Sequence, residues 1–149
     1  MPITLLVRRK AGCEDLPLPR YMSEAAAGMD VCAAVDEPIA LEPGDVQRVP
    51  TGLFLAVPEG YEVQVRPRSG LALAHGLVVV NSPGTIDSDY RGEVGVIVGN
   101  VRREPFTITR GLRIAQLVVA PVERAEVRLV EELPDSRRGD GGFGSSGTH

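Results

Sequence analysis

The sequence predicts an all-β domain, a sandwich or barrel of short strands, with one short helix. Runs of branched aliphatic residues recur along the chain and are interrupted by proline and glycine at short intervals. The 149 residues include 17 glycines and 12 prolines without a repeat, which suits tight turns better than long helices. A chain of this length has the usual size of one domain with one core.

The best strand signal is the segment Tyr61–Arg66, which alternates polar and apolar residues. Alternate side chains of a strand point to opposite faces, so this pattern predicts a strand with one buried face. Pro67 ends it. The other predicted strands are residues 3–8, 29–35, 39–41, 46–49, 52–57, 77–80, 94–98, 113–120 and 126–131.

The predicted helix covers residues 69–74 and is less than two turns long. Ser69 is placed to cap its start, and Gly76 is placed to end it in a left-handed conformation. An alanine-rich stretch at residues 23–27 predicts a single helical turn that Gly28 closes.

Composition argues against several partners and cofactors. The formal net charge is −4 and the charges are scattered, so no basic face for nucleic acid or an anionic membrane is expected. No stretch approaches the roughly 20 apolar residues of a membrane span. Cys13 and Cys32 lack CxxC spacing and a matching set of histidines, which predicts reduced thiols and no zinc site. With no signal-peptide core at the N-terminus, we expect a cytoplasmic protein.

Residues 81–95 contain the densest group of candidate functional side chains. They connect two apolar runs and read as a polar hairpin. If the segment is extended, Asp87 and Asp89 point to one face with Ser88 opposite. Aspartates are common in turns for their local hydrogen bonds, so a turn role is the alternative to general-base or metal chemistry. Tyr90 offers a flat wall for a sugar or a base.

Three further sites combine polar groups with apolar surroundings. Asp30 enters an apolar strand, where an unpaired charge is costly, so it should meet water, a cation or a metal. Arg68, Ser69 and Gly70 at a helix start suit a phosphate, although a capped helix beside a surface arginine is the commoner case. Gln116 interrupts an apolar strand and needs partners from an edge position or a ligand.

The last residues change character, which divides the chain into a β-rich part at residues 1–136 and a flexible glycine-rich segment at 137–149. A disordered end is the simplest interpretation. Arg138 and Phe143 favour a segment that closes over phosphates, because glycines let successive N–H groups turn toward one anion. The segment is not a Walker A loop, since Ser145 stands where the lysine should be.

Five blocks in this order, with this spacing, closely resemble the motifs of the trimeric dUTPases, bacterial type. They span nearly the whole chain: AGMDVCA at 27–33, RPRSGLALAHGL at 66–77, VNSPGTIDSDYRGEVGV at 80–96, RGLRIAQLVV at 110–119 and RGDGGFGSSG at 138–147.

The resemblance implies a jelly-roll-like β subunit and a homotrimer whose three active sites are each built from all three chains. It implies hydrolysis of dUTP to dUMP and pyrophosphate, which prevents uracil incorporation into DNA and supplies dUMP for dTMP synthesis. Asp87 would be the general base that activates water for attack on the α-phosphorus. Asp30 would hold the water shell of Mg²⁺, with the metal itself chelated by the triphosphate.

The resemblance also assigns the substrate contacts. Asn81 and the backbone around Gly84 and Gly95 would read the uracil edge, Tyr90 would exclude a 2′-hydroxyl, and Phe143 would stack on uracil. The phosphate chain would be contacted by Arg68, Ser69, Gly70, Gln116, Arg138, Ser145 and Ser146. The remaining substrate-binding residues would be Thr85, Ile86 and Gly144.

One position departs from the pattern. Leu112 replaces an expected acidic or polar residue, which predicts altered pairing of Arg113 with activity retained. Two alternatives stay open: an enzyme like dCTP deaminase with the same fold, and a non-catalytic dUTP-binding sensor.

Overall fold

The computed structural model describes residues 2–149 and shows, in that range, eleven strands and one short helix. This confirms the predicted all-β class. The elements are β1 (Leu6–Arg9), β2 (Arg20–Tyr21), β3 (Met29–Cys32), β4 (Ile39–Leu41), β5 (Val46–Ala56), β6 (Tyr61–Arg66), α1 (Ser69–His75), β7 (Leu77–Val79), β8 (Gly84–Ile86), β9 (Glu93–Asn100), β10 (Phe106–Ile108) and β11 (Arg113–Pro121).

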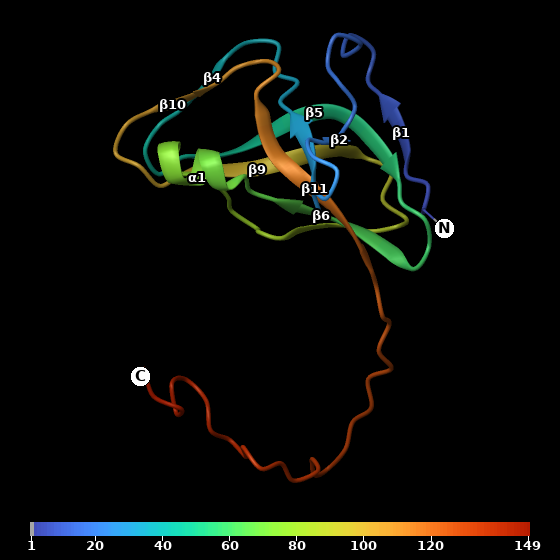
Figure 1. Ribbon diagram of the computed structural model, residues 1–149, viewed down its shortest axis with the longest axis vertical. Helices are drawn as coiled ribbons and strands as arrows, with labels where there is room; N and C mark the ends of the chain where they lie inside the picture. The colour runs from blue at the N-terminus through green and yellow to red at the C-terminus, as the bar shows by residue number, and fades with distance from the viewer. Residues whose placement is uncertain (1) are drawn as a thin grey trace.

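The strands form two main antiparallel sheets and a small extra ribbon. One sheet has the order β1-β5-β9-β7, the other has the order β2-β3-β11-β6-β8, and β10 pairs with β4. Apart from β2 and β3, neighbours in the two large sheets are not consecutive in the chain, so the sheets are interwoven in a jelly-roll-like sandwich (Figure 1).

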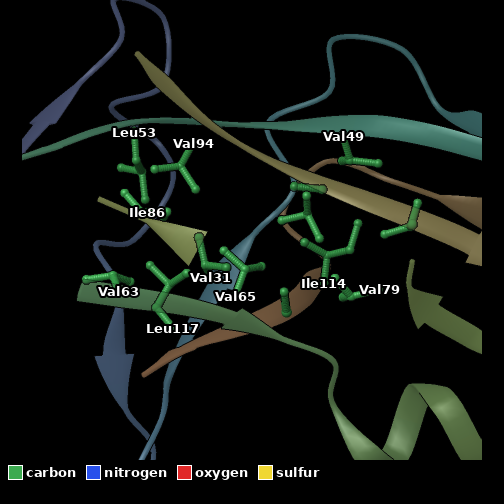
Figure 2. Packing of buried hydrophobic residues seen from close by; sticks show 14 of the residues in the cluster. Val31, Val49, Leu53, Val63, Val65, Val79, Ile86, Val94, Ile114 and Leu117 are labelled. Carbon is green, nitrogen blue, oxygen red and sulfur yellow. The ribbon is translucent and has the colours of Figure 1, made fainter. Parts of the chain in front are cut away.

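The main core lies between the two large sheets. Val49 and Val94 project from one sheet, and Val63 and Leu117 project from the other, as Figure 2 shows. All four side chains are buried. Alternation along β6 explains the arrangement: its valines face the core, while the polar residues between them lie nearer the surface.

The predicted strand break at Pro50 is wrong, because β5 is one continuous strand. Residues 46–49 and 52–57 were expected to be separate strands, divided at Pro50. They form one strand whose pairing with β9 shifts register between Pro50 and Phe54. A proline is tolerated at such an irregularity because the ladder hydrogen bond is already lost there. Thr51 lies within this irregular stretch, and its Oγ1 donates a hydrogen bond to the carbonyl of Val94 at 2.6 Å.

Ser69 was predicted to cap the helix from outside, but it is already part of the helix, and the cap lies one residue earlier. Arg68, not Ser69, is the N-cap residue, with extended dihedral angles (φ −97°, ψ 129°) and no side-chain cap hydrogen bond. Ser69 is therefore the first helical residue, and its hydroxyl is exposed and not used as a cap. Gly76 ends the helix in the left-handed conformation, as predicted, and its N–H bonds to the carbonyl of Ala72 at 3.0 Å.

The predicted last strand is absent from the structure. Residues 126–131 are not a strand: within residues 2–149 no strand pairs with them, and Val127 and Leu129 are almost wholly exposed. After β11 the chain leaves the body in a wide arc and ends apart from it (Figure 1).

Residues 23–27 make a single turn, closed by a hydrogen bond from Ala26 N–H to the carbonyl of Ser23 at 3.2 Å. The short strands β2, β8 and β10 were not predicted.

A smaller cluster contains both cysteines. Cys13 and Cys32 are free thiols buried with Leu16 and Ala34, and burial raises the pKa of the Cys32 thiol. Arg110 secures the segment that carries Cys13 by donating to Asp15 at 2.7 and 2.9 Å, and this hydrogen bonding lowers the pKa of Asp15. Among residues 2–149, no helix has the length and apolar character needed to cross a membrane.

We predict that Thr51→Val destabilises the fold by about 1–3 kcal/mol, because it leaves the buried carbonyl of Val94 without its donor. Urea denaturation at one fixed protein concentration measures the change. Thr107→Val on β10 is the control, since that threonine is exposed. Equal stability of the two variants would contradict the structural role of Thr51.

Candidate active site

A pocket of about 170 Å³ lies where β8 and the start of β9 meet. It gathers seven of the residues singled out from the sequence: Asn81, Gly84, Thr85, Ile86, Asp87, Tyr90 and Gly95. Five more were not foreseen: Arg48, Val65, Glu93, Val94 and Ile97. The structure therefore brings the central motif together as one concave site.

The path of residues 81–95 explains how this pocket forms. The flanking strands β7 and β9 do pair, as a hairpin would, with Val79 opposite Val98. The connection between them is not a simple loop, because it contributes β8 to the other sheet, where Gly84 pairs with Val65. The polar-hairpin interpretation is thus wrong for the connection, which crosses from one sheet to the other and back.

The two aspartates occupy a turn, so the extended arrangement expected for them is wrong. Tyr90 N–H donates to the carbonyl of Asp87 at 3.2 Å and closes this turn. Asp87 is exposed and lines both the pocket and an adjoining surface hollow. Asp89 lines only the hollow. The geometry separates the two carboxylates and leaves Asp87 as the one at the pocket.

Tyr90 is held against the start of β9. Its hydroxyl donates to the carbonyl of Glu93 at 3.1 Å, and a Cβ added at Gly92 would collide with the ring. Arg91 braces the turn by donating to the carbonyls of Ser88 and Tyr90 at 2.7 and 2.9 Å. The glycine after Arg91 is therefore required by the position of the tyrosine ring.

Gly84 has a similar role beside the amide. A Cβ at Gly84 would lie 3.2 Å from Cβ of Val65 and 3.3 Å from Nδ2 of Asn81, closer than ordinary van der Waals contact. Glycine at this position lets the Asn81 side chain lie close to β8 at the pocket wall.

A second group of predicted residues lies around Asp30 and does not line the pocket. Asp30 Oδ2 forms an ion pair with Nε of Arg68 at 3.2 Å and accepts a hydrogen bond from Nη1 of Arg113 at 3.0 Å. Arg68 also donates to the carbonyl of Arg113 at 3.0 Å. The side chain of Asp30 is only 13% exposed, so the expectation that it meets a cation is confirmed in the form of two guanidinium groups.

Gln116 supports the same group from the central strand β11. It is not at a sheet edge, since β11 lies between β3 and β6, and that part of the expectation is wrong. Its amide donates to the carbonyl of Pro67 at 2.9 Å, and a Cβ at Gly28 would collide with its oxygen. Gln116 thus fixes the residue that precedes Arg68.

The departure at Leu112 has a packing explanation. The side chain is half-buried and packs against the main core, so an apolar residue suits the position. Its neighbour Arg113 pairs with Asp30.

The glycine-rich segment does not reach either group. Phe143 is fully exposed with a left-handed backbone (φ 49°), and Arg138 donates to the carbonyl of Gly141 at 2.6 Å. Gly144, Ser145 and Ser146 are exposed as well, as are Ser69 and Gly70 at the helix start. Within one chain the predicted site is therefore divided into three parts.

These features define a β-sandwich with a small polar pocket lined from both sheets and a separate group of two arginines around Asp30. Comparison with known proteins identifies the class. The family model named dUTPase matches residues 14–147. A deoxyuridine 5'-triphosphate nucleotidohydrolase of Anaeromyxobacter sp. (strain Fw109-5) is 60% identical over 149 residues, covering 99% of each chain.

Solved structures agree with this comparison. A mutant Staphylococcus bacteriophage 80alpha dUTPase with dUpNHpp is 29% identical, with a TM-score of 0.83, over 97% of this chain and 99% of its own. A mutant dUTPase of the Staphylococcus aureus phage phi11, described with a structural Mg(II) ion, is 28% identical, with a TM-score of 0.77, over 87% and 98%.

The chain belongs to the dUTPase family. Membership confirms the resemblance read from the sequence, and it confirms the enzyme class, dUTP diphosphatase. Arg48 and Glu93 are the two charged residues among the five pocket residues that the sequence did not reveal. They form one contact, from Nη2 of Arg48 to the carbonyl of Glu93 at 3.0 Å, between positions 45 apart in the sequence. No local pattern could have revealed it.

We predict that Asp30→Asn lowers the free energy of unfolding by about 1–2 kcal/mol, because two neighbouring guanidinium groups lose their shared anion. This is less than the roughly 3–5 kcal/mol of a fully buried pair, since both arginines are partly exposed to screening solvent. Chemical denaturation measures the loss. Asp135→Asn in the exposed C-terminal segment is the control, and equal stability of both variants would contradict the pairing.

Proposed function

We propose that this enzyme hydrolyses dUTP to dUMP and pyrophosphate, with Asp87 as the general base. The observation that carries the proposal is the position of Asp87, exposed at a pocket that Asn81, Gly84, Tyr90 and Gly95 also line. An ionised carboxylate there can take a proton from water as the water attacks the α-phosphorus. In the cytoplasm such an activity would keep uracil out of DNA and supply dUMP for dTMP synthesis.

The size of the pocket supports a nucleoside bound only by its base and sugar. About 170 Å³ is well below the roughly 300–1,000 Å³ of a pocket for a drug-sized ligand. Asn81 offers a side-chain amide, and the glycines leave backbone groups accessible, which suits the paired donors and acceptors of a uracil edge. Tyr90 would form the wall that excludes a 2′-hydroxyl. The phosphates would then extend outward past Asp87.

The division of the site supports a homotrimer. Arg68, Ser69, Gly70 and Gln116 suit the phosphate chain but do not line the pocket that contains Asp87. The segment that carries Phe143 leaves the body of its own chain (Figure 1). Copies of the chain that share their sites would supply all three parts at once. In such an assembly Arg138, Gly144, Ser145 and Ser146 would close over the phosphates, and Phe143 would stack on uracil.

A Mg²⁺ ion fits this arrangement when the substrate carries it. Among residues 2–149, no three histidine, cysteine or acidic side chains gather into a metal cage. Mg²⁺ keeps several waters and is usually held by one or two carboxylates together with substrate phosphates. Asp30 would accept hydrogen bonds from such waters, since both of its arginine contacts fall on Oδ2. When bound, the ion offsets negative charge on the triphosphate.

We predict that Asp87→Asn lowers kcat for dUTP by about 10²–10⁴-fold, because the amide cannot accept the proton from water. Pyrophosphate release with Mg²⁺ measures it. Asp89→Asn is the matched control and should turn over near the wild-type rate, since Asp89 does not line the pocket. Rapid turnover by Asp87→Asn would exclude Asp87 as the base. Ammonia release from dCTP would favour a deaminase, and binding of dUTP without turnover would favour a sensor.

We predict that truncation after Arg137 lowers turnover of dUTP by roughly 100-fold, because contacts that align the substrate are removed. The trimer should persist, as judged by sedimentation velocity, because the sandwich and its core lie before residue 122. A shorter truncation after Gly147 is the control and should retain the wild-type rate. An unchanged rate after the longer truncation would mean that residues 138–147 are an ordinary disordered end.

A further inference from the structure

The pocket contains a cationic side chain that none of the motifs includes. Arg48 lies on β5 opposite Ile97 of β9, and its side chain runs along β9 to the carbonyl of Glu93. The path crosses Gly95, where an added Cβ would collide with the arginine side chain. Glycine at position 95 is therefore the residue that lets Arg48 reach the start of β9.

The same carbonyl accepts a hydrogen bond from Tyr90. Nη2 of Arg48 lies 3.0 Å from the Glu93 oxygen, and the hydroxyl of Tyr90 lies 3.1 Å from it. A carbonyl oxygen has two lone pairs, so it can accept from both donors. One backbone group thus joins a pocket-lining arginine to the tyrosine ring.

Residues of β5 hold the groups next to this shared acceptor. The side chain of Glu93 accepts from Gly52 N–H at 2.9 Å, and Thr51 donates to the next carbonyl, that of Val94, at 2.6 Å. Both contacts come from the register shift of β5. These two contacts hold the side chain of Glu93 and the carbonyl of Val94, whereas the side chains that donate to the Glu93 carbonyl itself are those of Arg48 and Tyr90.

We propose that Arg48 is a positioning residue that sets the discrimination between deoxyribonucleotide and ribonucleotide through Tyr90. The inference rests on the proposed role of Tyr90 as the wall against the sugar. Arg48 occupies the space over Gly95, and it holds the carbonyl to which the tyrosine hydroxyl binds. Tyr90 is 43% exposed, and its ring is held by the hydrogen bond to this carbonyl and by packing over Gly92. Without Arg48 the ring shifts and a 2′-hydroxyl gains room.

The test compares kcat/KM for dUTP and for UTP in four proteins: wild type, Arg48→Met, Tyr90→Phe and the double variant. Arg48→Met keeps an unbranched stem and removes the donors. We expect the dUTP to UTP ratio to fall roughly fivefold, the effect of one lost hydrogen bond, with kcat for dUTP little changed. Tyr90→Phe should give a similar fall, and the double variant should add little to it, because both residues act through one carbonyl.

Controls separate this inference from the proposed function. Arg9→Met makes the same chemical change on an exposed residue of β1 and should leave the ratio unchanged. A wild-type enzyme with equal rates on dUTP and UTP would contradict the sugar wall itself. A discriminating wild type with an unchanged ratio in Arg48→Met, even with a lower melting temperature, would overturn only the role of Arg48. An equal loss for both nucleotides that Arg48→Lys restores would also overturn it, since the charge would then act on the phosphates.

Discussion

The pairing of β8 with β6 is the constraint on which the pocket depends. Three residues, Gly84–Ile86, leave the sheet of β7 and β9 and join the opposite sheet, which pulls the following turn to the edge of the sandwich. Asp87 follows β8 directly, so its position is set by backbone hydrogen bonds on a rigid strand. A carboxylate that follows a rigid strand has a defined position, which the proposed role of general base requires.

The other charged residues of the proposed site lie around Asp30, apart from Asp87. Asp30 neutralises part of the charge of two arginines that would otherwise repel each other near the surface. Five N–H donors on each guanidinium exceed what one carboxylate can use, so donors remain for a polyanion. Gln116, secured on a central strand, keeps the chain before Arg68 in place. In the proposed assembly this group would contact the phosphate chain, and another copy of the chain would supply the nucleoside pocket.

The sequence predicted local features well and long-range contacts poorly. Alternation in Tyr61–Arg66 and the glycine at position 76 led to the right strand and the right helix end, because their causes lie within a few residues. Pro50 suggested a strand break, whereas pairing with β9 carries the strand across it with a shifted register. Arg48 could not be found, since its partners are brought to it only by the sheet. The functional assignments came from the order of the five motifs, because spacing between motifs preserves information that single residues lack.

The composition of the C-terminal segment suits the proposed closure over a nucleotide. Ordering each residue costs roughly 1–2 kcal/mol of backbone entropy, so a closing segment of ten residues needs strong contacts to offset that cost. A charge-assisted bond from Arg138 to phosphate and stacking by Phe143 are the strongest single contacts that such a segment can make. Glycine allows the left-handed turns already present at Gly139, which follows Arg138, and at Gly144, which follows Phe143. If the segment closes as proposed, a few strong contacts on a flexible chain would favour closure when the nucleotide is bound and release when pyrophosphate leaves.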